Sequence, residues 1–170
     1  MSVETQEELE SIVGGIPGAV GADLTTYLNI YVKEHNLGTV FNADTEFELP
    51  GIGRRKPDIA FASFATVPEI SSDAVGVPPD LAVEVVSKTD STDDSDLKIL
   101  EYRQASIKLV WVIRTVLKLI EIYHPGDEKP TVLGVSDTLK GENVVPGFEL
   151  AVSKLFNLSN AKWRSPGPKK

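Results

Sequence analysis

The sequence predicts one α/β or α+β domain with a mixed central sheet, and three observations indicate this fold class. The chain has 170 residues, a length that can bury roughly 70% of the surface that the unfolded chain exposes. Segments with helical and with strand-like spacing follow one another in the order ααββ, a loop, and βαβββα. No internal repeat or low-complexity linker divides the chain. We therefore expect residues 1–158 to form a single domain and residues 159–170 a C-terminal tail.

The N-terminal third predicts two helices and then two antiparallel strands. Residues 5–13 begin with a threonine and carry acids in the first turn, which suits the positive end of a helix dipole. Residues 19–35 place apolar side chains three and four positions apart, the spacing of a longer amphipathic helix. Residues 39–49 and 54–63 alternate in polarity around a Pro-Gly turn and predict two antiparallel strands.

The rest of the chain predicts a central strand, a helix and further strands. Residues 64–79 read as an irregular connection, and residues 80–87 as a strand with apolar side chains on both faces, which is typical of a central position. A polar loop at 88–96 then caps a helix that we expect to begin at about residue 97 and end at about 105. The remaining predicted elements are strands at 109–113 and 117–124, an edge strand at 130–136, and a short helix at 152–156.

Composition and charge exclude several kinds of chemistry. The absence of cysteine excludes a thiolate nucleophile, a zinc ribbon and an iron–sulfur cluster. The acidic N-terminal segment is unlike a signal peptide, and no apolar run is long enough to span a bilayer. We therefore expect a cytoplasmic protein that does not contact membranes.

The net charge of −8 argues against a broad phosphate-binding surface. The excess of acids is confined to two runs, residues 4–10 and residues 90–96, which hold four acids each and no base. These eight acids account for the whole excess over the 17 Lys and Arg residues, so the remaining body of the chain is formally neutral. The second run directly precedes Lys98 and would repel a phosphate there unless a metal ion or salt compensates.

Two acids lie inside segments that otherwise read as buried strands. Asp58 occurs in RRKPDIAF and Glu84 in PPDLAVEVVS, although charged side chains rarely occupy interior strand faces unless they are paired or bind a metal. A separation of 26 residues lets one strand leave the sheet and the next return beside it, so both carboxylates could bind one Mg²⁺ ion. In the alternative interpretation, each carboxylate lies at a strand end and is solvated or paired with Arg54 or Lys56.

Lys98 is the third candidate. It lies in the first turn of the expected helix, and Tyr102 lies four residues later on the same face. A lysine directed at the Glu84 strand could hold an attacking water molecule or neutralise charge that develops on a phosphate. The alternative is a surface lysine that pairs with Asp94 or Glu101.

Two further sets of residues are weaker candidates. The run Arg54, Arg55 and Lys56 could contact phosphate or form a solvated turn. Asp80 precedes Glu84 by four residues and so shares its strand face. Asp80 could support the site or simply mark the start of the strand.

A resemblance extends over residues 40–156 and depends on the order of several segments. These segments are NADTEFELP, RRKPDIAF, PPDLAVEVVS, the polar loop with Lys98 and Tyr102, KLVWVIRT, IEIYHPG and VLGVSDTLKGENVVPGFEL. Together they resemble the Uma-type family of restriction endonucleases, which have the PD-(D/E)xK nuclease fold. The resemblance implies a restriction-endonuclease-like mixed central sheet flanked by helices.

The same resemblance implies a metal site. Asp58, Glu84 and the backbone carbonyl of Val85 would bind Mg²⁺ or Mn²⁺, and Lys98 with Tyr102 beside it would supply the basic group. In the general nuclease pattern a lysine lies two residues beyond the second acid, whereas this chain has Val86 there.

Two features of the implied site stay open: which lysine supplies the basic group, and which residue supplies an additional acid. Lys88 is a less favoured substitute for Lys98, because it lies in the predicted loop. Nucleases of this fold often add an acid from the first helix, for which Asp23 and Glu34 are both candidates.

The resemblance therefore implies a homodimeric, metal-dependent endonuclease that hydrolyses phosphodiester bonds of nucleic acid, most simply DNA. The alternative is a non-catalytic module for binding or dimerisation that keeps the nuclease fold, since a fold alone does not determine function. The two interpretations differ in geometry: an active nuclease requires that Asp58, Glu84 and Lys98 converge in one cleft.

Overall fold

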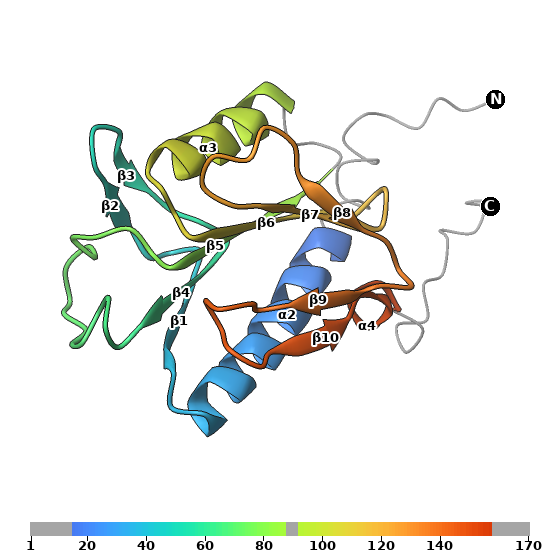
Figure 1. Ribbon diagram of the computed structural model, residues 1–170, viewed down its shortest axis with the longest axis horizontal. Helices are drawn as coiled ribbons and strands as arrows, with labels where there is room; N and C mark the ends of the chain where they lie inside the picture. Colours follow the sequence, from blue (N-terminus) through green and yellow to red (C-terminus); the bar gives the residue numbers. More distant parts are fainter. Residues whose placement is uncertain (1–14, 88–91, 158–170) are drawn as a thin grey trace, which may run out of the picture.

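Six short strands form a central sheet, and helices and hairpins cover both of its faces (Figure 1). The computed structural model describes residues 15–87 and 92–157. Their elements are α2 (Gly15–Glu34), β1 (Gly38–Asn42), β2 (Phe47–Leu49), β3 (Gly53–Arg55), β4 (Ile59–Ser63), β5 (Leu81–Val86), α3 (Thr92–Gln104), β6 (Leu109–Arg114), β7 (Leu119–Tyr123), β8 (Thr131–Leu133), β9 (Thr138–Lys140), β10 (Glu149–Ala151) and α4 (Val152–Phe156).

The main sheet is mixed and has the order β1-β4-β5-β6-β7-β8. Strands β5 and β6 pair in parallel, and the other neighbours in this sheet are antiparallel. Strand β5 therefore lies between β4 and β6, the central position that its two apolar faces predict. It pairs with β6 along its whole length but with β4 only over residues 81–83, and β1 and β8 form the edges of the sheet. The predicted α+β class with a mixed central sheet is confirmed.

Alternate residues of the central strands build two separate cores. One core contains Leu81, Val83 and Trp111 and packs against α2, α4 and the β9–β10 hairpin. The other contains Ala60, Ala82 and neighbouring side chains, and packs against α3 and the β2–β3 hairpin. Glu84 has the parity of Ala82, so its side chain faces the layer that contains α3.

Helix α2 follows directly from the spacing of its apolar residues. Val20, Leu24, Leu28 and Val32 repeat every four positions and are fully buried. The helix ends where Asn36 adopts φ +51°, a left-handed conformation that asparagine tolerates. The predicted helix is thus confirmed, although it begins four residues earlier than expected.

Three sequence-based expectations need correction. The two long antiparallel strands are each broken in two: β1 and β4 join the main sheet, while β2 and β3 form a separate hairpin. Helix α3 begins at Thr92 rather than at about residue 97, because Thr, Asp and Ser suit the N-terminal turns of a helix. The β9–β10 hairpin was not predicted, since each of its strands has only three residues.

The other predicted strands and the short terminal helix are confirmed, and residues 64–79 form an irregular connection apart from one bridge at Val75. The helix expected at 5–13, the tail expected at 159–170 and Lys88 lie outside the described residues. Within residues 15–87 and 92–157, no helix is both long and apolar enough to cross a membrane.

His124 joins the end of β7 to the turn of the β9–β10 hairpin. Its Nδ1 lies 2.9 Å from an Asp127 oxygen, and its Nε2 lies 2.7 Å from a Glu142 oxygen. Hydrogen bonds to Asp127 and then to Glu142 raise the pKa of His124 above its usual value of 6.5. The contribution of His124 to stability is therefore complete below pH 6.5 and is lost as the pH rises through the raised pKa of the folded protein.

We expect His124→Ala to lower the midpoint of urea unfolding at pH 5.5 and to have a smaller effect at pH 8.5. Equal effects of the substitution at both pH values would contradict this assignment.

Candidate active site

The site forms where β4 and β5 separate. The backbone pairing of these strands ends at Ile59 and Val83, and Asp58 lies one residue beyond it. Asp58 Oδ2 accepts a hydrogen bond of 2.7 Å from the backbone N–H of Val85, so the carboxylate continues the ladder in place of a carbonyl group. Its other oxygen, Oδ1, accepts no hydrogen bond from the part of the chain that the structure describes. This oxygen is therefore suited to bind a cation.

Glu84 is a buried carboxylate with two donors from one helix. Only 5% of the residue is exposed, and it faces α3. The Lys98 ammonium group donates to Oε2 at 3.0 Å, and the Tyr102 hydroxyl group donates to Oε1 at 2.5 Å. These charge-assisted bonds offset part of the cost of burying the acid.

The raised pKa of Glu84 indicates that the hydrogen bonds from Lys98 and Tyr102 do not fully offset the cost of burying its charge. Burial raises the pKa of Glu84 to about 7, and the negative charge of Asp58 adds to this effect, while Tyr102 and Lys98 oppose it. Burial and the Glu84 charge also raise the pKa of Tyr102, so its hydroxyl group remains a proton donor at neutral pH. A cation beside Asp58 and Glu84 would relieve this excess of negative charge.

Helix α3 brings Lys98 and Tyr102 to Glu84 because residues four positions apart share one helix face. The sequence predicted Lys98 in the first turn of this helix. Because α3 begins at Thr92, Lys98 lies in the second turn instead. The earlier start also places Asp94 on the face of Lys98. Both line the pocket.

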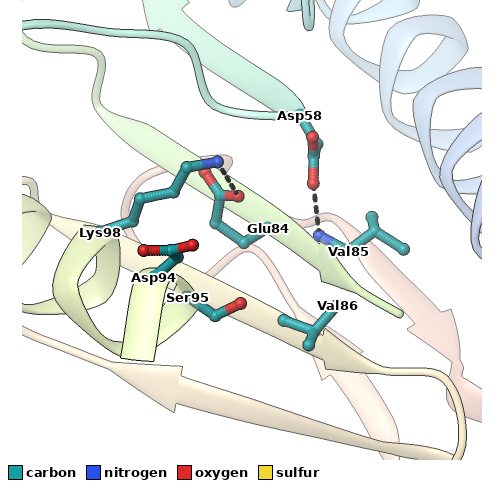
Figure 2. A pocket seen from close by; sticks show the side chains of 7 residues that line it. All are labelled: Asp58, Glu84, Val85, Val86, Asp94, Ser95 and Lys98. Atoms are coloured by element: carbon teal, nitrogen blue, oxygen red, sulfur yellow. Dashed lines mark hydrogen bonds and ion pairs between the residues drawn. The ribbon is translucent and has the colours of Figure 1, made fainter. Parts of the chain in front are cut away.

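One pocket joins these groups, and Figure 2 shows Asp58, Glu84 and Lys98 around it. It is lined by Asp58, Glu84, Val85, Val86, Asp94, Ser95 and Lys98. The sequence interpretation did not place Asp94 and Ser95 in the site. The i, i+4 spacing of Asp94 and Lys98 could have indicated the first of them, had the helix start been predicted correctly.

The available oxygen atoms suit a hard divalent cation. Two carboxylates and a nearby backbone carbonyl are typical protein ligands of Mg²⁺, which keeps several water molecules. Within residues 15–87 and 92–157, however, no three His, Cys, Asp or Glu side chains are close enough together to hold a metal ion. Mg²⁺ bound by Asp58 and Glu84 would keep several water molecules as its other ligands.

Asp80 lies outside this pocket and instead stabilises the start of β5. It accepts hydrogen bonds from the Ser63 backbone at 2.7 Å, the Thr66 hydroxyl group at 2.9 Å and the Lys108 ammonium group at 2.6 Å. Burial alone would raise the pKa of Asp80, but these bonds outweigh it and lower the pKa below its usual value. The geometry favours the interpretation in which Asp80 marks the strand start.

We expect Asp80→Ala to destabilise the protein by about 2–3 kcal/mol, because a buried hydrogen-bonded charge is lost. A lowered pKa means that this stabilisation is present above about pH 4 and is lost as the pH falls through the folded-state value. Urea unfolding at pH 7 measures the loss. Equal stability of wild type and Asp80→Ala at pH 7 would contradict this structural role.

Two other candidates, Arg54 and Lys56, lie in ion pairs on the β2–β3 side of the molecule. Arg54 contacts Glu46 and Glu48 at 3.4 and 3.3 Å, and Lys56 contacts Glu46 at 3.7 Å. Neither lines the pocket around Glu84. Arg54 lies in β3 rather than in the solvated turn expected as the alternative to a phosphate contact, and the exposed side chains of Arg54 and Lys56 pair with these acids at the surface.

Helix α2, the first helix that the structure describes, contributes no acid to the pocket. Neither Asp23 nor Glu34 lines it. On the other side of Asp58, α2 presents Gly18, Gly21 and Thr25 to a second pocket. The expected acid from the first helix is therefore not placed at the site.

Comparison with known proteins identifies the family. Residues 6–153 match the family model Uma2, whose description is "putative restriction endonuclease". The chain belongs to the Uma2 family. The resemblance inferred from the order of the sequence segments is thus confirmed. No curated protein matches the chain.

A solved structure shares the fold of this Uma2 protein. It is described as a putative nuclease belonging to DUF820, from Anabaena variabilis ATCC 29413. The TM-score is 0.73 at 18% sequence identity, and the match covers 84% of this chain and 80% of that one. At this identity the likeness shows the fold alone.

Proposed function

We propose that this Uma2 protein is a metal-dependent endonuclease that hydrolyses phosphodiester bonds in DNA. The observation that carries the proposal is the convergence of Asp58, Glu84 and Lys98 on one pocket. Family membership supports nuclease function and nucleic-acid binding. This convergence is the geometric feature that distinguishes an active nuclease from a binding module.

In the proposed site, Asp58, Glu84 and the carbonyl group of Val85 would hold Mg²⁺ or Mn²⁺. A bound divalent cation supplies Lewis acidity, which polarises a phosphate and lowers the pKa of a bound water molecule. Asp58 Oδ1 is available for this role, while Oδ2 fixes the carboxylate against β5.

Lys98 and Tyr102 complete the proposed chemistry. In hydrolysis, a water oxygen forms a bond to phosphorus, the bond from phosphorus to one ester oxygen breaks, and that oxygen takes up a proton. The Lys98 ammonium group is partly exposed and lies 3.0 Å from Glu84, so it can turn to an attacking water molecule or to the developing phosphate charge. Buried Tyr102 holds the other Glu84 oxygen in place.

Lys98 could also replace the lysine that the general nuclease pattern has two residues beyond the second acid, where this chain has Val86. Val86 lines the same pocket but cannot supply a cation, whereas Lys98 reaches that pocket from α3. The non-catalytic alternative predicts no cleavage at all.

We further propose that the protein acts in the cytoplasm as a homodimer, as the family resemblance implies. Light scattering coupled to gel filtration tests the dimer.

Nicking of a supercoiled plasmid tests the proposed activity. We expect cleavage with Mg²⁺ or Mn²⁺, none with EDTA, and a loss of at least about a hundredfold in Asp58→Asn. Asparagine keeps an oxygen that can accept the Val85 N–H bond, so the fold should persist. Asp73→Asn, an exposed acid far along the 64–79 connection, is the matched control. Equal rates for Asp58→Asn and Asp73→Asn would contradict the proposal.

A further inference from the structure

Helix α3 carries two groups of the proposed site but has a narrow apolar contact with the sheet. Its buried apolar side chains within residues 94–104 are Ile99 and Tyr102. Leu97 and Leu100 are 54% and 45% exposed and cannot anchor it. A helix with so narrow an apolar stripe depends on polar contacts for its exact position.

One of these polar contacts, a two-pronged ion pair, joins α3 to β3. Arg55 donates from Nε to Glu101 Oε2 and from a terminal nitrogen to Glu101 Oε1. Glu101 is buried and Arg55 is about two-thirds buried. The hairpin that carries Arg55 is itself anchored, because Phe47 and Leu49 are fully buried in the core beneath α3. Paired donors in this geometry fix direction as well as distance.

The pair is close in sequence to the site on both sides. Arg55 precedes Asp58 by three residues, while Glu101 follows Lys98 by three residues and precedes Tyr102 by one. We propose that Arg55 and Glu101 form a positioning pair, which fixes α3 so that Lys98 and Tyr102 reach Glu84 opposite Asp58. This proposal rests on the proposed nuclease function and assigns a role to a charged pair outside the pocket.

Arg55 is poorly suited to contact a phosphate directly. Two of its nitrogen atoms donate to Glu101, and the third, Nη1, donates to the carbonyl oxygen of Arg54 at 2.8 Å. A phosphate contact and a positioning role predict different kinetics. Loss of a phosphate contact raises KM for DNA, whereas loss of positioning lowers kcat with little change in KM.

The test compares Arg55→Met and Glu101→Gln with the matched control Arg54→Met, whose arginine pairs with the partly exposed acids Glu46 and Glu48 on β2 and the loop before it. Plasmid nicking gives kcat and KM. The Cζ resonance of Tyr102 in protein labelled with ¹³C-tyrosine, assigned with Tyr102→Phe, reports the hydrogen bond to Glu84 without any metal or substrate. Two variants guard against misfolding: Arg55→Lys, and the charge exchange Arg55→Glu with Glu101→Arg.

We expect Arg55→Met and Glu101→Gln each to lower kcat at least tenfold with KM within about twofold, and to shift the Tyr102 resonance. Arg54→Met should change neither, and the charge exchange should recover part of kcat. Arg55→Met behaving as Arg54→Met in both readouts, or raising KM alone, would overturn the positioning role. If the wild type neither cleaves DNA nor binds Mn²⁺, the nuclease proposal fails, and the Tyr102 resonance alone then decides whether the pair positions α3.

Discussion

Glu84→Gln is expected to reduce metal-dependent cleavage by about a thousandfold. The substitution keeps the volume of the side chain and an oxygen that can accept the Tyr102 hydrogen bond, but it removes the negative charge that would bind the cation. Plasmid nicking at saturating Mn²⁺ measures the loss. Cleavage within tenfold of wild type would exclude Glu84 as a ligand.

The same substitution should stabilise the protein. The pKa of Glu84 is about 7 in the folded protein against an ordinary value of 4.5. Its favourable contribution is thus present below pH 4.5 and is lost as the pH rises through 7. A shift of this size corresponds to about 3 kcal/mol at pH 8. Urea unfolding should show a more stable Glu84→Gln variant at pH 8 and little difference at pH 4.5; a less stable variant at pH 8 would contradict the electrostatic assignment.

Lys98→Met is expected to reduce kcat by about a hundredfold, because the proposed mechanism has Lys98 supply a preorganised positive charge to the reacting phosphate. Binding of Mn²⁺ should persist or become tighter, since Lys98 no longer competes for the Glu84 carboxylate. Calorimetric titration and plasmid nicking on the same preparation separate the two effects.

Two control variants make the Lys98 result specific. Lys140→Met removes an exposed lysine that pairs with Glu149 on the β9–β10 hairpin and should leave kcat unchanged. Lys98→Arg keeps the positive charge and should recover part of the rate. Full activity in Lys98→Met, or a loss of Mn²⁺ binding in that variant, would contradict the proposed role.

The sequence was sufficient to predict the central strands and the three groups of the candidate site. Glu84 was recognisable because an acid within a buried strand needs a partner, and it has one in the structure. Asp58 lies one residue before β4 rather than within it, and it too has a partner, the backbone N–H of Val85. The alternation along β5 also predicted that Glu84 shares a face with Ala82 and Val86, while Leu81 and Val83 pack on the other side. These inferences depend on local periodicity, which a single segment contains.

Features that depend on contacts between distant segments could not be predicted. The break of each long strand follows from the burial of Phe47 and Leu49 beneath α3, a partner that lies about 50 residues away. Asp80 resembled a site residue because it shares a strand face with Glu84, yet Lys108 and Ser63 bind it at the other end of β5. The Arg55–Glu101 pair spans 46 residues and has no sequence signature.

The central claim is that Asp58 and Glu84 hold a divalent cation, and calorimetric titration with Mn²⁺ tests it most directly. Wild type and Asp73→Asn should each bind one Mn²⁺ ion per chain, and Asp58→Asn should show no binding at the same concentrations. Absence of binding by the wild type, or equal binding by wild type and Asp58→Asn, would contradict the metal site and leave the chain a binding module with a nuclease fold.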